Sequence, residues 1–250
     1  MNRRQTQLTE LINSAGRVTF RELKDSFPDV SEMTIRRDLI YLDQLHKIVR
    51  TYGGAKSIRD AVGTDDVFSK RAVVNIENKR LIARKAVSLI TPNSAIYVDS
   101  GTTMTEFAKL IPDIPLIIFT GSLSVGIELA RLTLPEIKMF GGTLNKRSYC
   151  ESGTRGLEYV DTINFNCAFL GTTGYTDERG FNCGDENENI LKKRIMEKSD
   201  INIVLMDTSK VGISTAYTFA MPDNINIVVS DGNLPKKQME LFEKSGIHVL

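Results

Sequence analysis

The sequence predicts an α/β protein in two parts: an N-terminal winged helix-turn-helix domain, then a larger domain built on a parallel β-sheet. Up to about residue 57, apolar residues recur at helical spacing. From residue 78 onward, β-branched runs of strand length alternate with amphipathic helical segments. Strands that are apolar throughout and alternate with helices are typical of a parallel sheet covered on both faces. With 250 residues, of which 41% are hydrophobic, the chain can bury a substantial core.

The first part begins with two predicted helices. Apolar residues at helical spacing indicate the first helix, namely Leu8, Leu11 and Ile12. Gly16 is expected to end it, because glycine is a common C-terminal stop. Thr19 can cap a second helix that runs to about Phe27, where Pro28 breaks the pattern.

A third helix and a β-wing complete the predicted domain of residues 1–57. Ser31 is a favourable N-cap, and the helix after it carries one apolar stripe formed by Ile35, Leu39 and Leu42. A short extended run, Ile48–Thr51, then meets two glycines, as in the wing of a winged helix. Residues 58–77 have no strong period and are interpreted as a linker with room for one short helix.

The charge of the first part points to a nucleic-acid partner. Residues 1–57 contain ten basic and seven acidic residues, a net charge of +3, whereas the whole chain has a net charge of +1. The excess is modest, but it lies on the part with the helix-turn-helix pattern. It therefore favours a DNA-binding domain joined to a second domain with another task.

The third helix carries the candidate DNA contacts. Turning its apolar stripe toward the core places Arg37 on the opposite side and Thr34 and Arg36 on the flanks. Arginine on such a helix can donate two hydrogen bonds to guanine in the major groove. Asp38 is expected to orient an arginine or a neighbouring helix, because a carboxylate repels phosphate. We predict a surface for double-stranded DNA made of Arg17, Ser31, Glu32, Thr34, Arg36, Arg37, Arg50, Tyr52 and Gly53. The alternative is that these charges form an ordinary solvated face.

The second part, residues 78–250, is predicted to alternate between strands and helices. The expected strands are Ala95–Asp99, Pro115–Phe119, Ile137–Phe140, Cys167–Leu170, Ile203–Met206 and Ile227–Ser230, with Ile247–Leu250 as a candidate last strand. The expected helices are Lys79–Ile90, Met104–Leu110, Leu123–Leu132, Asn189–Lys198 and Lys236–Lys244.

Four clusters of small polar residues follow predicted strands and form a candidate ligand site. Ligands of open parallel sheets bind beyond the carboxyl ends of the strands. Backbone N–H groups and hydroxyls at such ends suit a phosphate, Lys210 would supply positive charge, and Asp99 could bind sugar hydroxyls. A single cluster of this kind is more often a plain turn, but four at one sheet edge favour a site. The candidate contacts are Asp99, Ser100, Gly101, Thr102, Thr103, Thr120, Gly121, Ser122, Gly171, Thr172, Thr173, Gly174, Asp207 and Lys210.

Further candidates line the same pocket. Gly141 and Gly142 are expected to form a tight turn at its wall. Asp185 and Glu186 stand near the start of a predicted helix, mainly as caps, with either one a possible pocket carboxylate. No P-loop or GxGxxG motif is present, which disfavours a nucleoside triphosphate or NAD.

The residues then carry a family resemblance. The segments "RRQTQLTELI", "VSEMTIRRDLIYLDQL" and "IVRTYGGA" resemble the N-terminal signature of DeoR-family transcriptional regulators. The segments "KRLIARKAVSLI", "IYVDSGTTM", "FGGTL", "FLGTTGY" and "VLMDTSKVG" resemble, in order, the effector domain of that family, which is similar in fold to ribose-5-phosphate isomerase. The resemblance implies a regulator of carbohydrate metabolism genes, most often a repressor, that binds a phosphorylated sugar at the clusters above. It also implies a homo-oligomer, a dimer or tetramer, whose heads bind paired half-sites.

An enzyme is the alternative to a regulator. Asp99, Glu186 and Lys210 provide residue types that an aldose–ketose isomerase needs, but an isomerase has no use for a DNA-binding domain. The residues do not assemble into a Ser-His-Asp or Cys-His set or into a metal motif, and no cofactor is predicted. The widely spaced Cys150, Cys167 and Cys183 are expected to be reduced thiols. A charged N-terminus and the lack of a long apolar run predict a cytoplasmic protein without membrane contact.

Overall fold

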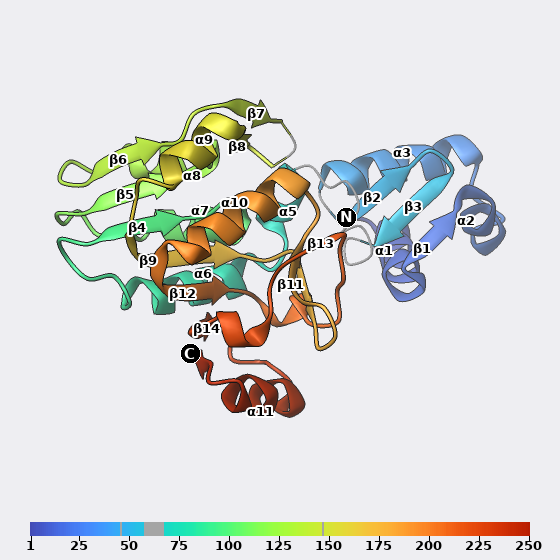
Figure 1. Cartoon of the computed structure of the whole chain (residues 1–250). Helices are drawn as coiled ribbons and strands as arrows, with labels where there is room; N and C mark the ends of the chain where they lie inside the picture. The colour runs from blue at the N-terminus through green and yellow to red at the C-terminus, as the bar shows by residue number, and fades with distance from the viewer. Residues whose placement is uncertain (46, 58–67, 147) are drawn as a thin grey trace. The chain divides into compact units, whose positions relative to one another are not determined.

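A computed structural model describes residues 1–45, 47–57, 68–146 and 148–250. The chain divides into two compact units, Met1–Val74 and Asn75–Leu250 (Figure 1). Within the described ranges, every helix is too short or too polar to cross a membrane.

The first unit is a winged helix-turn-helix, as predicted. Its elements are α1 (Arg3–Ala15), β1 (Arg17–Thr19), α2 (Phe20–Ser26), α3 (Glu32–Gln44), β2 (Ile48–Thr51) and β3 (Gly54–Ser57). The strands form an antiparallel sheet in the order β1-β3-β2, so β2 and β3 are the wing and the turn between them is its tip (Figure 1). The short strand β1 was not predicted, because a run of three residues carries no readable alternation.

Local capping signals set the helix boundaries of this unit. Gly16 follows α1 with a φ of 75°, a left-handed conformation that favours glycine. The Thr19 side chain accepts from the Glu22 N–H, and the Glu22 carboxylate accepts from the Thr19 N–H, which is a complete capping box. The Ser31 hydroxyl caps α3 by accepting from the Thr34 N–H. The three predicted boundary residues, Gly16, Thr19 and Ser31, are thus confirmed.

The core of the first unit contains the predicted stripe. Its buried members come from all three helices and all three strands: Leu8, Ile12, Val18, Leu23, Ile35, Leu39, Leu42, Ile48 and Ala55. Of the predicted linker, residues 58–67 lie outside the described part of the chain. A short helix follows, α5 (Phe68–Val73), and the second unit opens with α6 (Ile76–Val87).

A seven-stranded parallel sheet forms the centre of the second unit, in the order β15-β14-β12-β9-β4-β5-β6 (Figure 1). Every neighbouring pair in it is parallel. All seven predicted strands are present: β4 (Ala95–Val98), β5 (Ile117–Thr120), β6 (Glu136–Met139), β9 (Phe165–Gly171), β12 (Ser199–Leu205), β14 (Ile227–Val229) and β15 (His248–Val249).

Helices cover both faces of this sheet and create two hydrophobic cores. Side chains of α6, α7 (Thr102–Ala108) and α8 (Leu123–Leu129) pack with Ile96, Val98 and Phe169 on one face. Side chains of α9 (Thr154–Val160), α10 (Glu186–Glu197) and α11 (Lys236–Lys244) pack on the other face, which includes Tyr97 and Ala168. Neighbouring residues of one strand alternate between the two cores, so both faces are buried.

Several short elements of the second unit were not predicted. A separate antiparallel sheet consists of β10 (Gly174–Thr176), β11 (Gly180–Cys183) and β13 (Tyr217–Ala220). A hairpin of β7 (Thr143–Asn145) and β8 (Cys150–Ser152) precedes α9, which was also missed. Elements of three to seven residues depend on partners elsewhere in the chain, so the local sequence carries little signal for them.

Candidate DNA-binding surface and ligand site

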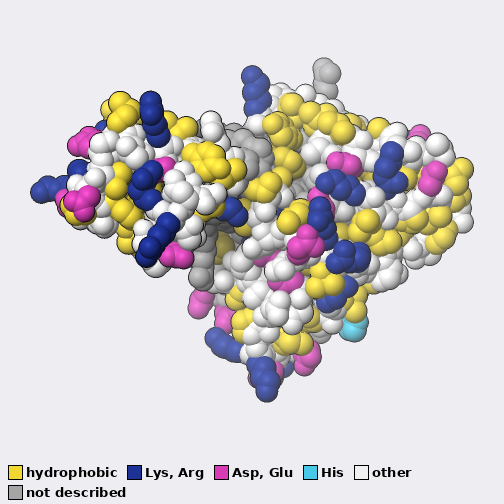
Figure 2. Space-filling model, turned by 180° about the vertical axis from the view of Figure 1, so that it is seen from behind, with side chains coloured by type: hydrophobic (Ala, Val, Ile, Leu, Met, Phe, Trp, Pro, Cys, Tyr) yellow, Lys and Arg dark blue, Asp and Glu magenta, His cyan; other side chains and the backbone are white. Residues whose placement is uncertain are grey.

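Helix α3 presents the predicted basic residues away from the core of the first unit. Arg36 and Arg37 are both exposed, and Thr34 is partly exposed with its hydroxyl 2.9 Å from that of Ser31. The Glu32 carboxylate lies 3.9 Å from the Arg36 guanidinium, one helical turn away. Glu32 therefore contacts an arginine of the predicted surface, and Ser31 acts as the cap of the helix. In Figure 2 several Lys and Arg side chains project from this smaller unit, with acidic ones between them.

Asp38 has the orienting role that the sequence predicted. It is buried, and its carboxylate accepts hydrogen bonds from Arg4 Nε at 2.5 Å and from Gln5 Nε2 at 2.9 Å. Both partners lie on α1, so this carboxylate holds α1 against α3. The hydrogen bond to Asp38, opposed by burial and assisted by its charge, raises the pKa of Arg4.

The wing carries the remaining DNA candidates. Tyr52 and Gly53 form the exposed turn between β2 and β3, and the Tyr52 side chain is fully exposed. Arg50 is exposed on β2, with its backbone N–H donating to the Asp43 carboxylate at 3.2 Å. Arg17 is exposed on β1 and pairs in register with Lys56. These exposed positions are compatible with contacts to a DNA backbone.

The four predicted polar clusters follow four consecutive strands of the parallel sheet. In the order β12, β9, β4 and β5, these strands end at Asp207–Lys210, Gly171–Gly174, Asp99–Thr103 and Thr120–Ser122. The carboxyl ends of parallel strands share one edge of the sheet. The tertiary structure therefore places the four clusters side by side in space, although Asp99–Thr103 and Asp207–Lys210 are more than a hundred residues apart in sequence.

A buried ion pair occupies the middle of this edge. Lys192 of α10 donates to the Asp99 carboxylate and, at 2.9 Å, to the Gly171 carbonyl. The Asp99 carboxylate also accepts from the Gly171 N–H at 2.8 Å and from the Tyr97 hydroxyl at 3.1 Å. The clusters that follow β4 and β9 are thus joined through Asp99. Sequence reasoning missed Lys192.

The charges around this pair explain the protonation of its neighbours. Burial is the largest single effect on Lys192 and disfavours its ammonium, but the charges of Asp99, Cys183 and Glu188 and the hydrogen bond to Asp99 together outweigh burial and raise the pKa of Lys192. Burial raises the pKa of Glu188, with Lys192 opposing the shift and Asp99 adding to it. Burial also raises the pKa of the Cys183 thiol to about 11, against the effect of Lys192. These residues form a buried polar centre with one fixed positive charge.

A chain of hydroxyls joins the clusters that follow β4 and β5. The Ser122 hydroxyl lies 3.0 Å from that of Ser124, which lies 3.1 Å from that of Thr105 on α7. The Thr120 hydroxyl accepts from the Ser122 N–H at 3.0 Å. Thr120 and Ser122 are buried, whereas Thr103 is partly exposed. On this side of the sheet edge, hydroxyls rather than charges face one another.

The remaining predicted contacts have structural partners of their own. Asp207 is buried and caps the short turn Thr208–Lys210, and its carboxylate also accepts from Asn75 Nδ2 at 3.3 Å. The Thr172 hydroxyl donates to the Gly174 carbonyl at 2.7 Å. The predicted charge donor Lys210 is partly exposed in that turn.

Asp185, Glu186, Gly141 and Gly142 lie around α10 and the end of β6. Asp185 caps α10 by accepting from the Glu188 N–H at 3.0 Å, whereas Glu186 is exposed. Both glycines have positive φ, 75° and 129°, as the predicted tight turn requires.

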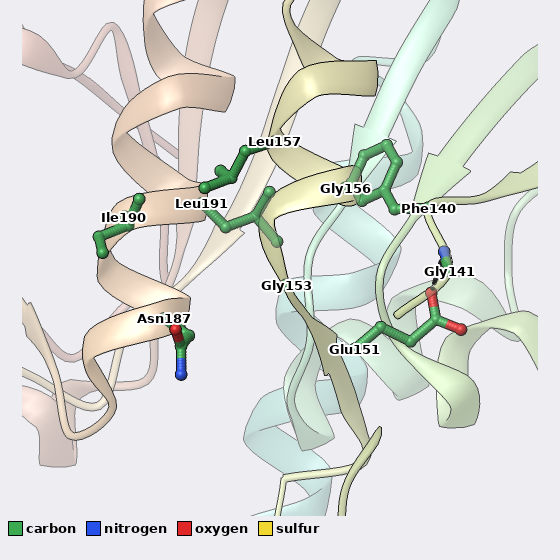
Figure 3. Close-up of a pocket in the computed structure, with 9 residues that line it drawn as sticks. All are labelled: Phe140, Gly141, Glu151, Gly153, Gly156, Leu157, Asn187, Ile190 and Leu191. Carbon is green, nitrogen blue, oxygen red and sulfur yellow. Dashed lines mark hydrogen bonds between the residues drawn. The ribbon is translucent and has the colours of Figure 1, made fainter. Parts of the chain in front are cut away.

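A cavity of about 210 Å³ lies beside this turn, between α9 and α10 (Figure 3). Apolar side chains and glycines form most of its wall, with two polar residues: Phe140, Gly141, Glu151, Gly153, Gly156, Leu157, Asn187, Ile190 and Leu191. The Gly141 N–H donates to the Glu151 carboxylate at 2.9 Å (Figure 3). Among the described residues, no group of three or more His, Cys, Asp or Glu is arranged to hold a metal ion.

Comparison with known families matches both units. Residues 4–61 match the DeoR-like helix-turn-helix domain, and residues 74–232 match the DeoR C terminal sensor domain. The chain belongs to the DeoR family. The match to the second model alone extends over more than half of the chain. This DeoR-family chain therefore has both parts that its sequence resembles, a helix-turn-helix domain and a sensor domain.

Full-length relatives of this DeoR-family protein are transcriptional regulators. It is 31% identical to the uncharacterized HTH-type transcriptional regulator YulB of Bacillus subtilis (strain 168), over 98% of this chain and 95% of the relative. It is also 31% identical to the HTH-type transcriptional regulator GlpR of Haloferax volcanii, over 99% and 96%. The HTH-type transcriptional repressor GlcR of Bacillus subtilis (strain 168) is 26% identical, over 99% and 95%.

Among solved structures, the chain has weak similarity to a ribose 5-phosphate isomerase. Ribose 5-phosphate isomerase A of Methanocaldococcus jannaschii aligns with a TM-score of 0.41 and 16% identity, over 55% of each chain. Similarity at this level supports no conclusion about activity.

Proposed function

We propose that this DeoR-family regulator represses carbohydrate-metabolism genes by binding operator DNA, and that a phosphorylated sugar at the carboxyl edge of the parallel sheet changes its DNA affinity. The observation that carries this proposal is a combination in one chain. A capped helix presents Arg37 away from its core, and a parallel sheet presents four polar strand ends at one edge. The first feature suits a major groove, and the second suits a small anionic ligand.

The DNA half of the proposal rests on α3 and the wing. Arg37 lies opposite the buried stripe of Ile35, Leu39 and Leu42, where it can reach base edges. Exposed Arg50 and Tyr52 on the wing would contact the backbone of the same duplex. We expect the heads of a homo-oligomer, a dimer or tetramer, to bind paired half-sites.

The ligand half rests on the strand ends around Asp99. The hydroxyls and backbone N–H groups of Ser100–Thr103 would hold the phosphate, and the polar side chains near Gly171 would bind the sugar. Lys192 is paired with Asp99, so its main role here would be to orient that carboxylate. The other predicted contacts at this edge would complete the site.

Coupling between the two units has a physical basis at their junction. Asn75, the first residue of the second unit, has a left-handed backbone with a φ of 51°. Its amide donates to Asp207 at 3.3 Å and to Ser209 at 3.2 Å, both in the loop after β12. A ligand that reorganises this loop would act on the residue from which the chain continues into the DNA-binding unit.

A binding experiment tests the DNA half. The full chain selects duplexes from a randomised pool, and affinity for the selected duplex is compared with that for a scrambled one. Arg37→Ala is expected to weaken binding to the selected duplex by about 1–3 kcal/mol without loss of folding, because a base contact is removed. Lys236→Ala, which removes an exposed charge from α11, is the matched control. A chain that selects no duplex contradicts the DNA half.

A titration tests the ligand half. Phosphorylated sugars are added one at a time to the complex of the chain with its selected duplex. At least one is expected to change DNA affinity by about 5- to 150-fold, the usual range of coupling between sites. Thr103→Val should blunt this response, whereas Thr162→Val, whose hydroxyl donates to the Tyr159 carbonyl on α9, should not. If no phosphorylated sugar changes affinity, the ligand half is wrong.

A sugar-phosphate isomerase with a DNA-binding head is the second candidate. Asp99, Glu188 and Lys192 lie together at the sheet edge, and the pKa of Glu188 is raised, as a proton-transfer group requires. Against this, the Asp99 carboxylate already accepts three hydrogen bonds from Tyr97, Gly171 and Lys192. Turnover of ribose 5-phosphate that Glu188→Gln abolishes would favour the enzyme.

A further inference from the structure

Phe20, the first residue of α2, contacts both halves of the predicted DNA surface. Its backbone N–H donates to the Gly53 carbonyl in the turn of the wing, at 2.7 Å. Its ring lies 4.3 Å from the Arg36 guanidinium carbon on α3. The ring is half-buried and packs against the core of the first unit, which holds it in place. Phe20 is therefore a fixed support between the wing and the third helix.

The contact with the Phe20 ring leaves Arg36 able to bind DNA. An aromatic face attracts the cation but does not use the in-plane N–H donors of the guanidinium, so those donors remain available for DNA. The Arg36 side chain remains 58% exposed, and the Glu32 carboxylate contacts it at 3.9 Å. The ring and the carboxylate both contact the guanidinium, and together they would favour one orientation of it. A restricted side chain loses less conformational entropy when it binds.

We propose that Phe20 is a positioning residue that sets the orientation in which Arg36 reads a guanine base. Its hydrogen bond to Gly53 connects the same residue to the wing turn, so the wing and the third helix would bind the duplex with a fixed position relative to each other. This inference rests on the proposed DNA-binding function and assigns a specificity role to a residue outside the third helix. Phe20 itself need not touch DNA.

A double-mutant cycle tests the assignment in the full chain. Affinities for the selected duplex and for a scrambled duplex are measured for wild type, Phe20→Leu, Arg36→Ala and the double variant. Phe20→Leu keeps an apolar side chain but removes the aromatic ring, and it should weaken specific binding by about two- to fivefold. Binding to the scrambled duplex should stay the same, since phosphate contacts are intact. In the Arg36→Ala background, Phe20→Leu should cost nothing further, because the two residues act as one unit.

Two further variants separate positioning from folding. Phe20→Tyr keeps the ring, and it should discriminate between the two duplexes as well as wild type does. Phe27→Leu changes another partly buried ring of the same core, and it should leave discrimination unchanged. Circular dichroism of each variant verifies that the first unit is folded.

The possible outcomes are distinct. If Phe20→Leu weakens specific binding equally in the wild type and in the Arg36→Ala background, the positioning role alone is wrong. The same conclusion follows if Phe20→Leu binds the selected duplex more tightly than wild type. Discrimination that Phe27→Leu reduces as much as Phe20→Leu also overturns the positioning role. A wild-type chain that selects no duplex overturns the proposed DNA-binding function and this inference with it.

Discussion

At the scale of single residues, the buried pair of Asp99 and Lys192 joins α10 to the edge of the parallel sheet. Both side chains are buried, and the pair is surrounded by Tyr97, Glu188 and Cys183. Two charges removed from water are stable only when they compensate each other and are hydrogen-bonded. The Gly171 N–H and carbonyl supply those bonds from β9. The pair therefore holds α10 to the ends of two strands.

We expect Lys192→Met to destabilise the second unit strongly, by about 3–5 kcal/mol, because it leaves the Asp99 charge buried without an opposite charge to compensate it. Removing both charges in Asp99→Asn/Lys192→Met should recover much of that loss. Urea unfolding of the full chain measures the effect. Lys193→Met, at the exposed neighbouring position, is the control and should change stability by less than about 0.5 kcal/mol. Equal stability of Lys192→Met and Lys193→Met would contradict the role assigned to the pair.

At the scale of elements, α10 contributes side chains both to the cavity beside Gly141 and to the polar centre at Asp99. Asn187, Ile190 and Leu191 line the cavity beside Gly141 (Figure 3). Glu188 and Lys192 of the same helix lie near Asp99. Residues at i and i+4 share a face of a helix, so Glu188 and Lys192 project the same way. The N-cap Asp185 sets where the helix begins and hence which residues have each role.

The start of α2 makes a second prediction about an element. Thr19→Ala should destabilise the first unit by about 1 kcal/mol, because it removes one half of the capping box. Ser14→Ala, which removes an exposed hydroxyl near the end of α1, is the control. Melting curves monitored by circular dichroism should show a lower midpoint for Thr19→Ala only.

The same capping box predicts a pH dependence. Hydrogen bonds from the Thr19 N–H and hydroxyl lower the pKa of Glu22 below its ordinary value of 4.5. A lowered pKa means that the carboxylate stabilises the fold above the ordinary value, and that this contribution is lost as the pH falls through the lowered one. Glu22→Gln should therefore reduce stability at pH 7 and flatten its change below about pH 4.5. An unchanged acid profile would contradict this account.

At the scale of the whole molecule, the two units have separate cores and separate tasks. The first unit buries its stripe among three short helices and a small sheet, and the second buries both faces of a parallel sheet. Each core is built from residues of its own unit. Under the proposed function, a ligand at the sheet edge would therefore act on the DNA-binding unit through the covalent junction at Asn75, without repacking either core.

We expect the full chain to be a dimer or tetramer at the concentrations at which it binds its selected duplex, since a helix-turn-helix protein gains affinity by binding two half-sites. Light scattering would then give two or four times the chain mass of 27.9 kDa. A chain of single mass that binds the duplex with full affinity would contradict this expectation.

The sequence by itself determined most of the architecture, because the signals that specify it are local. Gly16, Thr19 and Ser31 mark helix boundaries through their own backbone preferences and side-chain caps. The parallel strands were readable because burial on both faces leaves an uninterrupted apolar run. The orienting role of Asp38 was also predicted, because a carboxylate on a helix that faces DNA would repel phosphate.

Only the tertiary structure decided which polar residues meet. Lys192 and Lys193 are adjacent in sequence, and only folding shows that Lys192 reaches Asp99, 93 residues earlier in the chain. The strands β10, β11 and β13 were not predicted for the same reason, because their pairing joins segments up to about forty residues apart. The contact between Phe20 and Arg36 was not predicted either. Such contacts depend on how elements pack, and periodicity along the chain carries no record of that packing.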